Sequence, residues 1–198
     1  MIDKNQLYEW QRIDSENGLI EPWWSHPFMD YLKTWNLSGV TWLETGSGAS
    51  TAWLRSKCFW VDSVESSLQW AKDVEAYCDA EGLYNGAVLY NGDIPDGTPE
   101  GMKAYFDLLP ISKLYDVISI DGLYRTEMLQ WALDHFAENG GVLIADNFGQ
   151  DFVWISPKAE EIMAPYEAHV FAQPDHTNHE GRPWNTRYWI IPPQKPKP

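Results

Sequence analysis

The chain has 198 residues, and its 29 acidic against 14 basic side chains give a formal net charge of −15 at pH 7. This length suits one domain that buries a core of its own. The excess of negative charge repels phosphate backbones and anionic lipid surfaces, so we expect neither a nucleic acid nor a membrane as a partner. A small neutral or cationic molecule is the favoured ligand.

The sequence also bears on the compartment. Its first residues lack an apolar signal segment, and no apolar run reaches the roughly 18 residues that a spanning helix needs. Cys58 and Cys78 each lie beside or within an apolar stretch, which favours buried free thiols. We therefore expect a cytoplasmic, reduced protein.

In chain order, the sequence predicts helices that alternate with strands. Residues 1–25 predict one helix with a loop, and residues 26–35 predict a helix with one apolar face. The alternation that follows comprises strands 40–44, 59–64, 86–90, 115–120 and 142–145, helices 50–56, 66–81, 98–108, 124–138 and 155–164, and terminal strands 166–171 and 186–191. This order predicts an α/β, Rossmann-like fold with a mainly parallel seven-stranded sheet and helices on both faces.

The chain divides into three parts by composition. We expect residues 1–38 to form an N-terminal helical and aromatic cap segment, residues 39–192 to form the main α/β domain, and the Pro-rich tail 193–198 to be disordered. Trp23 and Trp24 lie in a Pro-flanked loop of the cap segment. They either stack on a ligand or cover the edge of the sheet.

Acidic residues follow the predicted strands. Glu44, Glu65, Asp121 and Asp146 each stand at a strand end, and Asp93 follows the third strand by one turn. The carboxyl ends of parallel strands meet at one edge of a sheet, which is where such folds bind ligands. The sequence therefore predicts a functional site built from these carboxylates.

The first of these acids opens a glycine-containing turn, Glu44-Thr-Gly-Ser-Gly48, before a predicted helix. Glycines let the backbone approach a ligand closely, and an acid after the second strand, Glu65, suits the two hydroxyls of a ribose. Both a dinucleotide and S-adenosylmethionine contain such a ribose. A dinucleotide turn needs G-x-G-x-x-G, but Thr51 stands at the third glycine position and Glu44 would repel the phosphates. The cationic S-adenosylmethionine is the better match.

Four motifs in order resemble those of class I S-adenosylmethionine-dependent methyltransferases. The segments 43–54 and 62–65 are similar to a small bacterial branch whose first motif reads E-x-G-S-G-x-S-T. The segments 115–122 and 140–147 resemble the fourth and fifth strands of the catechol O-methyltransferase-like group. The resemblance covers roughly residues 20 to 190.

This resemblance implies a set of cofactor-binding residues. The methionine end of the cofactor would lie on the glycine turn and near Asp121, the ribose on the second-strand acid, and the adenine amino group near Asp93. The residues implied are Glu44, Thr45, Gly46, Ser47, Gly48, Ser50, Glu65, Ser66, Asp93, Ile94 and Asp121.

The same resemblance implies a divalent metal, Mg²⁺ or another such ion, held by Asp121, Asp146 and Asn147. The metal would chelate the acceptor and lower the pKa of its hydroxyl. The group carries a lysine base three residues after the first metal ligand, but Tyr124 stands at that position here and Arg125 follows it. Asp121, Asp146 and His26 are the candidate catalytic residues, with His26 as a candidate general base.

The sequence thus predicts transfer of a methyl group from S-adenosylmethionine to a small-molecule acceptor, most readily an oxygen. A non-catalytic protein that binds the same cofactor and a nicotinamide-dependent oxidoreductase remain as alternatives. The apolar, Trp-rich surface is compatible with a homodimer.

Overall fold

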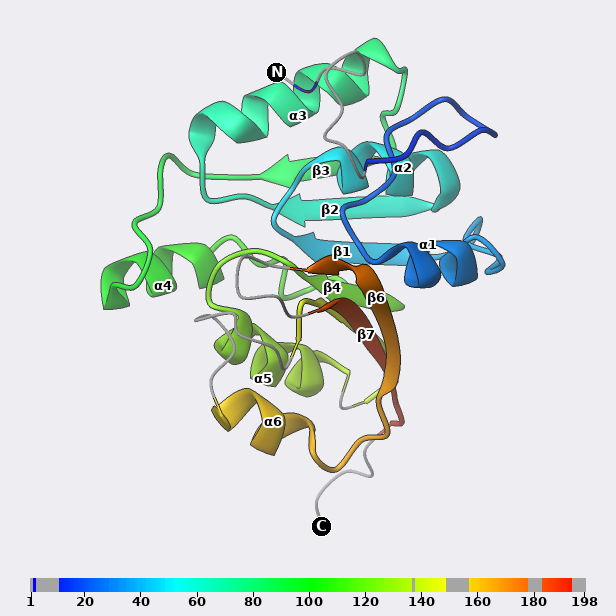
Figure 1. Ribbon diagram of the computed structural model, residues 1–198. Coiled ribbons are helices and arrows are strands. Elements are labelled where there is room, and N and C mark those ends of the chain that lie inside the picture. Colours follow the sequence, from blue (N-terminus) through cyan, green and yellow to red (C-terminus); the bar gives the residue numbers. More distant parts are fainter. Residues whose placement is uncertain (1, 3–10, 137, 149–156, 178–182, 194–198) are drawn as a thin grey trace.

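The computed structural model describes residues 2, 11–136, 138–148, 157–177 and 183–193, with the backbone alone at 174–177 and 183. Helices and strands alternate along most of the chain, as the sequence predicts (Figure 1). The helices are α1 (His26–Leu32), α2 (Ala49–Lys57), α3 (Leu68–Ala80), α4 (Pro99–Phe106), α5 (Arg125–His135) and α6 (Pro157–Met163). The strands are β1 (Thr41–Thr45), β2 (Trp60–Val64), β3 (Gly86–Leu89), β4 (Val117–Ile120), β5 (Gly141–Asp146), β6 (His169–Thr177) and β7 (Pro183–Ile191).

All seven strands form one sheet in the order β3-β2-β1-β4-β5-β7-β6. The pairs among β1 to β5 are parallel, and β7 runs antiparallel to both β5 and β6. The predicted mainly parallel, seven-stranded α/β sheet is therefore confirmed. Since β1 to β5 run the same way, their carboxyl ends share one edge of the sheet, which we call the carboxyl edge.

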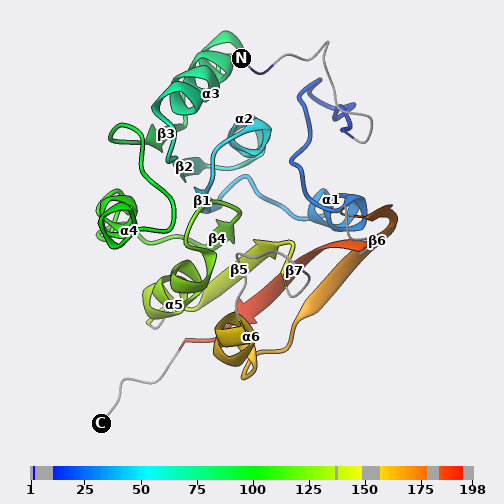
Figure 2. The same ribbon diagram turned by 60° about the vertical axis from the view of Figure 1, so that its left-hand side comes forward.

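Helices cover both faces of this sheet and bury two hydrophobic cores (Figure 2). One core packs residues of α1, α2 and α3 against the sheet, among them the fully buried Phe28 and Trp53. The other packs α4, α5 and α6 against the opposite face and includes Phe136 and Trp189. Burial of side chains of this size contributes roughly 1.5–3 kcal/mol each, so both layers hold the carboxyl edge in place.

The N-terminal part is a loop over residues 11–25, which agrees with the loop of the helix-and-loop prediction for residues 1–25. Residues 11–25 contain no helix and instead fold back on themselves, with a bridge between Ile13 and Ile20. The turn between them uses Gly18 at a φ of +68°, and the Asp14 amide donates to the Leu19 carbonyl at 2.8 Å. Glycine and short polar side chains favour such a turn over a helix. The helix predicted for the rest of this segment falls on residues 1–10, of which residues 1 and 3–10 lie outside the described residues.

Candidate functional site

The glycine turn lies where the strand order reverses. β1 and β4 are neighbours in the sheet but far apart in the chain, which makes the gap beyond their ends the topological switch point. Gly46 has a φ of +86°, and a Cβ atom placed on it would lie 3.0 Å from the Asp121 carbonyl carbon. A Cβ on Gly122 would lie 2.7 Å from the Gly46 nitrogen. The two loops thus touch through backbone, and each contact requires glycine.

Glu44, at the end of β1, is buried beneath this turn. Its Oε1 atom accepts hydrogen bonds from the Thr51 hydroxyl on α2 and from the Ser63 hydroxyl on β2, the latter at 2.6 Å. Burial raises the pKa of Glu44 from 4.5 to about 7, although these hydrogen bonds oppose the shift. A carboxylate in this place favours a cationic ligand over a phosphate at the adjacent start of α2.

Glu65, which follows β2, has both carboxylate oxygens engaged. One oxygen accepts from the Ser47 amide at 3.0 Å and from the Ser47 hydroxyl at 2.8 Å. The other accepts from the amides of Ser66 and Ser67 at 2.8 and 2.9 Å. The acid therefore ties the glycine turn to the start of α3. Trp70, on the first turn of α3, adds a hydrogen bond of 2.7 Å from its indole to the Ser47 carbonyl.

The loop after β3 is fixed to the same place. The Asp93 carboxylate accepts from the Leu68 amide at 2.9 Å, and the Ile94 amide donates to the Ser66 carbonyl at 2.8 Å. Ser67 caps α3, because the Ser67 hydroxyl accepts from the Trp70 amide. The predicted Ser66, Asp93 and Ile94 are thus neighbours, with Asp93 exposed at the surface.

Asp121, at the end of β4, pairs with Arg125, the first residue of α5. One Arg125 terminal nitrogen lies 2.8 Å from the Asp121 Oδ1 atom and 2.8 Å from the Asp121 carbonyl oxygen. The other donates to the Asp146 carbonyl at 3.0 Å, and Nε donates to the Gly122 carbonyl at 3.1 Å. Burial raises the pKa of Asp121, and the guanidinium charge opposes this shift.

Asp146, at the end of β5, is buried with a partner on each oxygen. Its Oδ1 accepts from the Thr186 hydroxyl on β7, and its Oδ2 accepts from the Asn147 side-chain amide, both at 2.6 Å. Burial and the nearby charge of Asp121 raise the pKa of Asp146 well above its usual range. Asn147 adopts a left-handed φ of 57°, and its buried Oδ1 has no hydrogen-bond partner among the described residues.

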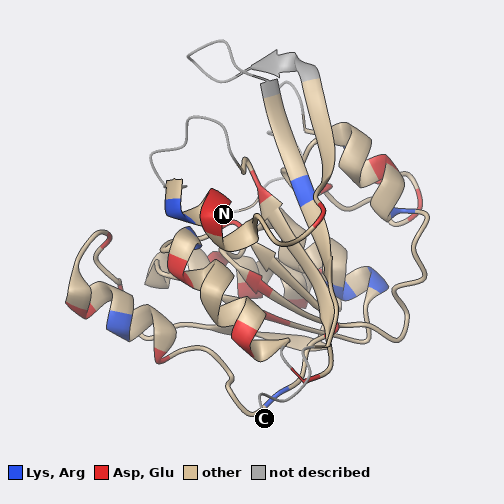
Figure 3. Cartoon of the chain, turned by 90° about the horizontal axis from the view of Figure 1, so that it is seen from below, with Lys and Arg blue, Asp and Glu red and all other residues tan. Residues whose placement is uncertain are grey.

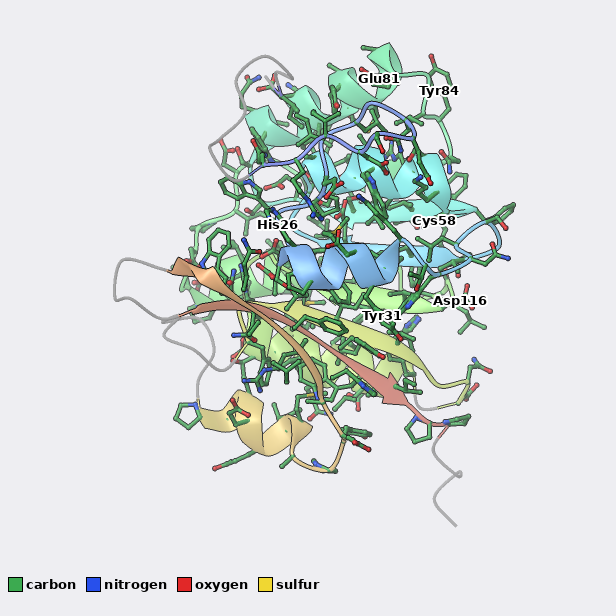
Figure 4. The ribbon with its side chains drawn as sticks, turned by 45° about the vertical axis from the view of Figure 1, so that its right-hand side comes forward. His26, Tyr31, Cys58, Glu81, Tyr84 and Asp116 are labelled. Carbon is green, nitrogen blue, oxygen red and sulfur yellow. The ribbon has the colours of Figure 1, made fainter. Side chains whose placement is uncertain are left out.

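The cap segment reaches this side of the carboxyl edge. The Ser25 amide donates to the Thr186 hydroxyl at 2.9 Å, one hydrogen bond away from Asp146. His26 is the next residue and begins α1, as Figure 4 shows; its Nδ1 lies 3.5 Å from the Gln173 side-chain nitrogen. Trp24 is buried in the core and stacks on Trp42, whereas Trp23 is 40% exposed.

The residues that the resemblance implies for a metal do not fit a divalent ion. Asp121 is paired with Arg125, and both Asp146 oxygens accept protein hydrogen bonds. The described part of the chain holds no group of three His, Cys, Asp or Glu side chains suited to a metal. We therefore derive no chemical step from a metal here.

The structure thus brings the predicted acids to one edge, and it adds partners that the sequence does not reveal. The spacing of Asp121 and Arg125, four residues apart, is a usable signal for their ion pair. Thr186 has no local signal, because it reaches Asp146 only through the pairing of β5 with β7.

Comparison with known proteins supports the fold. No family model and no curated protein sequence matches the chain. Among solved structures, a methyltransferase-like protein from Silicibacter pomeroyi is 19% identical over 90% of this chain and 91% of its own, with a TM-score of 0.58. An rRNA methylase from Streptococcus thermophilus is 13% identical over 84% and 95%, with a TM-score of 0.56. Magnesium protoporphyrin IX methyltransferase from Synechocystis PCC 6803, with SAH bound, is 12% identical over 82% and 78%, with a TM-score of 0.52.

At these identities the likeness concerns the fold, which is the α/β fold of S-adenosylmethionine-dependent methyltransferases.

Proposed function

We propose that the protein binds S-adenosylmethionine at the carboxyl edge and transfers its methyl group to a small-molecule acceptor. The observation that carries this proposal is the pair of buried acids, Glu44 and Glu65, on either side of the Gly46–Gly48 turn at the switch point. The cofactor's ammonium and sulfonium groups suit this acidic edge, whereas a pyrophosphate does not.

In this proposal, different residues of the chain contact the ribose, the adenine and the methionine end of the cofactor. Glu65 accepts hydrogen bonds from the ribose hydroxyls once Ser47 releases it, and the segment Asp93–Ile94 borders the adenine. Glu44 supplies negative charge for the methionine end, and Asp121, whose charge Arg125 offsets, borders the same end of the cofactor. When bound, the cofactor supplies a sulfonium-activated methyl group, and His26 accepts the proton that an acceptor hydroxyl or amine loses.

The proposal of a small-molecule acceptor is based on the net charge of the protein, because the fold does not identify the acceptor. One solved structure of similar fold is an rRNA methylase, so the fold admits both RNA and small molecules. The net charge of −15 opposes binding of a polyanion, which favours a small neutral or cationic acceptor.

Two measurements test the proposal. In calorimetry, S-adenosylmethionine should bind and NAD should not; the reverse result would support the oxidoreductase alternative. Methyl-tritiated cofactor should then label members of a panel of phenols, catechols and amines. Label in total tRNA or rRNA alone would reject the small-molecule acceptor, and binding without any transfer would support the non-catalytic alternative.

A further inference from the structure

Arg125 stands where the resemblance implies a cation. Its side chain is only 13% exposed and links the ends of β4 and β5, with contacts to Asp121, Gly122 and the Asp146 carbonyl at 2.8 to 3.1 Å. Four of the hydrogen bonds that a guanidinium can donate are therefore made to these two loops.

The local backbone directs Arg125 to this position. Tyr124, immediately before it, adopts a φ of 53°, a left-handed conformation that is rare for a bulky side chain. The Tyr124 hydroxyl is anchored by a hydrogen bond of 2.7 Å to the Pro95 carbonyl. The chain thus turns sharply between β4 and α5, and the first side chain of α5 points back to the strand ends.

A divalent ion at this place would compete with the guanidinium. Asp121 would have to exchange a charge-assisted pair for the metal, and the ion would then lie close to a buried positive charge. Both Asp146 oxygens already accept hydrogen bonds, whereas the Oδ1 atom of Asn147 has no partner among the described residues. Mg²⁺ is typically held in proteins by one or two carboxylates, and here the carboxylates of Asp121 and Asp146 are already engaged by protein donors.

We infer that the Arg125 guanidinium takes the place of a divalent metal, joins the ends of β4 and β5, and leaves methyl transfer independent of metal. Arg125 is a positioning residue in this account: it neutralises Asp121 without chelating an acceptor. The inference rests on the proposed function only in its statement about methyl transfer. Its structural part, that the guanidinium excludes the ion, is tested without cofactor or acceptor.

The test measures Mn²⁺ binding by calorimetry and electron paramagnetic resonance. Because the acidic surface binds Mn²⁺ non-specifically, each protein is compared with its Asp121→Asn derivative. In the unaltered protein, Asp121→Asn should leave Mn²⁺ binding unchanged. Arg125→Met, which keeps the length but removes the charge, should gain one Mn²⁺ ion that Asp121→Asn abolishes. Arg125→Lys should gain none.

Two results would overturn the inference. One is a saturable Mn²⁺ site in the unaltered protein that Asp121→Asn removes, a comparison that stands even if Arg125→Met fails to fold. The other is a folded Arg125→Met protein, judged by circular dichroism, that gains no Mn²⁺. Failure of the proposed function is recognised separately, because it shows as absent S-adenosylmethionine binding in the metal-free protein. If transfer is found, added chelator should not reduce its rate.

Discussion

Glu44 links the glycine turn to the pH dependence of folding. Its pKa of about 7 in the folded protein lies above its ordinary value of 4.5, so the folded state holds this proton more tightly than the unfolded chain. The stability that this carboxyl contributes is therefore fully present below its unfolded pKa. It is lost as the pH rises through its folded pKa.

Replacement of Glu44 by Gln should remove this dependence. Between about pH 4.5 and about pH 7, the free energy of unfolding of the unaltered protein should fall by about 3 kcal/mol relative to Glu44→Gln. Urea unfolding across this range measures it, and the difference between the proteins excludes the contributions of Asp121 and Asp146. Glu81→Gln, at the far end of α3, is the control. Parallel curves for the unaltered protein and Glu44→Gln would show that Glu44 is not buried as described.

The hydrogen bond from Ser47 to Glu65 leads to a second prediction, about cofactor affinity. Its hydroxyl occupies a Glu65 oxygen that the ribose needs, so its removal should favour the cofactor. Ser47→Ala should bind S-adenosylmethionine about fivefold more tightly, the equivalent of one hydrogen bond. Ser38→Ala, which removes an exposed hydroxyl that donates to the Asn36 side chain at 2.9 Å before β1, is the control. Weaker binding by Ser47→Ala would mean that this hydroxyl contacts the cofactor instead.

At the scale of elements, the connection between β4 and α5 holds the site together. Tyr124 carries a left-handed backbone, and its ring lies 5.8 Å from that of the buried Tyr105. Its hydrogen bond to the Pro95 carbonyl ties this connection to the loop that precedes α4. The loops after β3 and β4 are thus mutually braced.

Tyr124→Phe should lower the free energy of unfolding by about 1 kcal/mol, because it leaves the Pro95 carbonyl without this donor. Chemical unfolding measures the change. Tyr84→Phe removes a hydroxyl from a side chain that is 71% exposed and should change stability little. Equal effects of the two substitutions would contradict the bracing role of Tyr124.

Comparison of the predicted and observed strands shows which parts of the fold a sequence pattern can predict. β1 to β5 lie within two residues of their predicted bounds, because apolar runs that end in acids and glycines mark both the strand and its carboxyl end. Residues 11–25 form the loop of the predicted helix-and-loop segment, and long-range contacts set the path of this loop. The Trp53 indole, for example, donates to Asp14 at 2.7 Å across 39 positions of sequence. The partners of Glu65 and Asp146 are likewise set by tertiary contacts that no local spacing encodes.

For the whole molecule, charge is the dominant feature. Acidic side chains are spread over several helices and the strand ends, and basic side chains are few (Figure 3). With a net charge of −15, the acidic side chains repel one another in the compact state, and this repulsion destabilises the fold. No helix in the described ranges is long and apolar enough to cross a bilayer.

Salt should therefore stabilise the fold. Raising the ionic strength from about 0.01 M to about 0.15 M shortens the screening length from about 30 Å to about 8 Å and should raise the melting temperature. Differential scanning calorimetry at constant pH measures this, and sodium and potassium chloride should act equally if screening is the cause. A melting temperature that falls with either salt would show that attractive ion pairs outweigh the repulsion.

In the proposed function, a cofactor with a ribose and a positive charge binds at Glu65. Calorimetric titration of S-adenosylmethionine into the unaltered protein, Glu65→Ala and Glu81→Gln tests it most directly. Glu81 follows the last turn of α3, about 20 Å along the helix from Leu68 at its start. We expect at least a tenfold loss of affinity in Glu65→Ala, which is the scale of losing charge-assisted hydrogen bonds, and no change in Glu81→Gln. Equal affinities in all three proteins would contradict it.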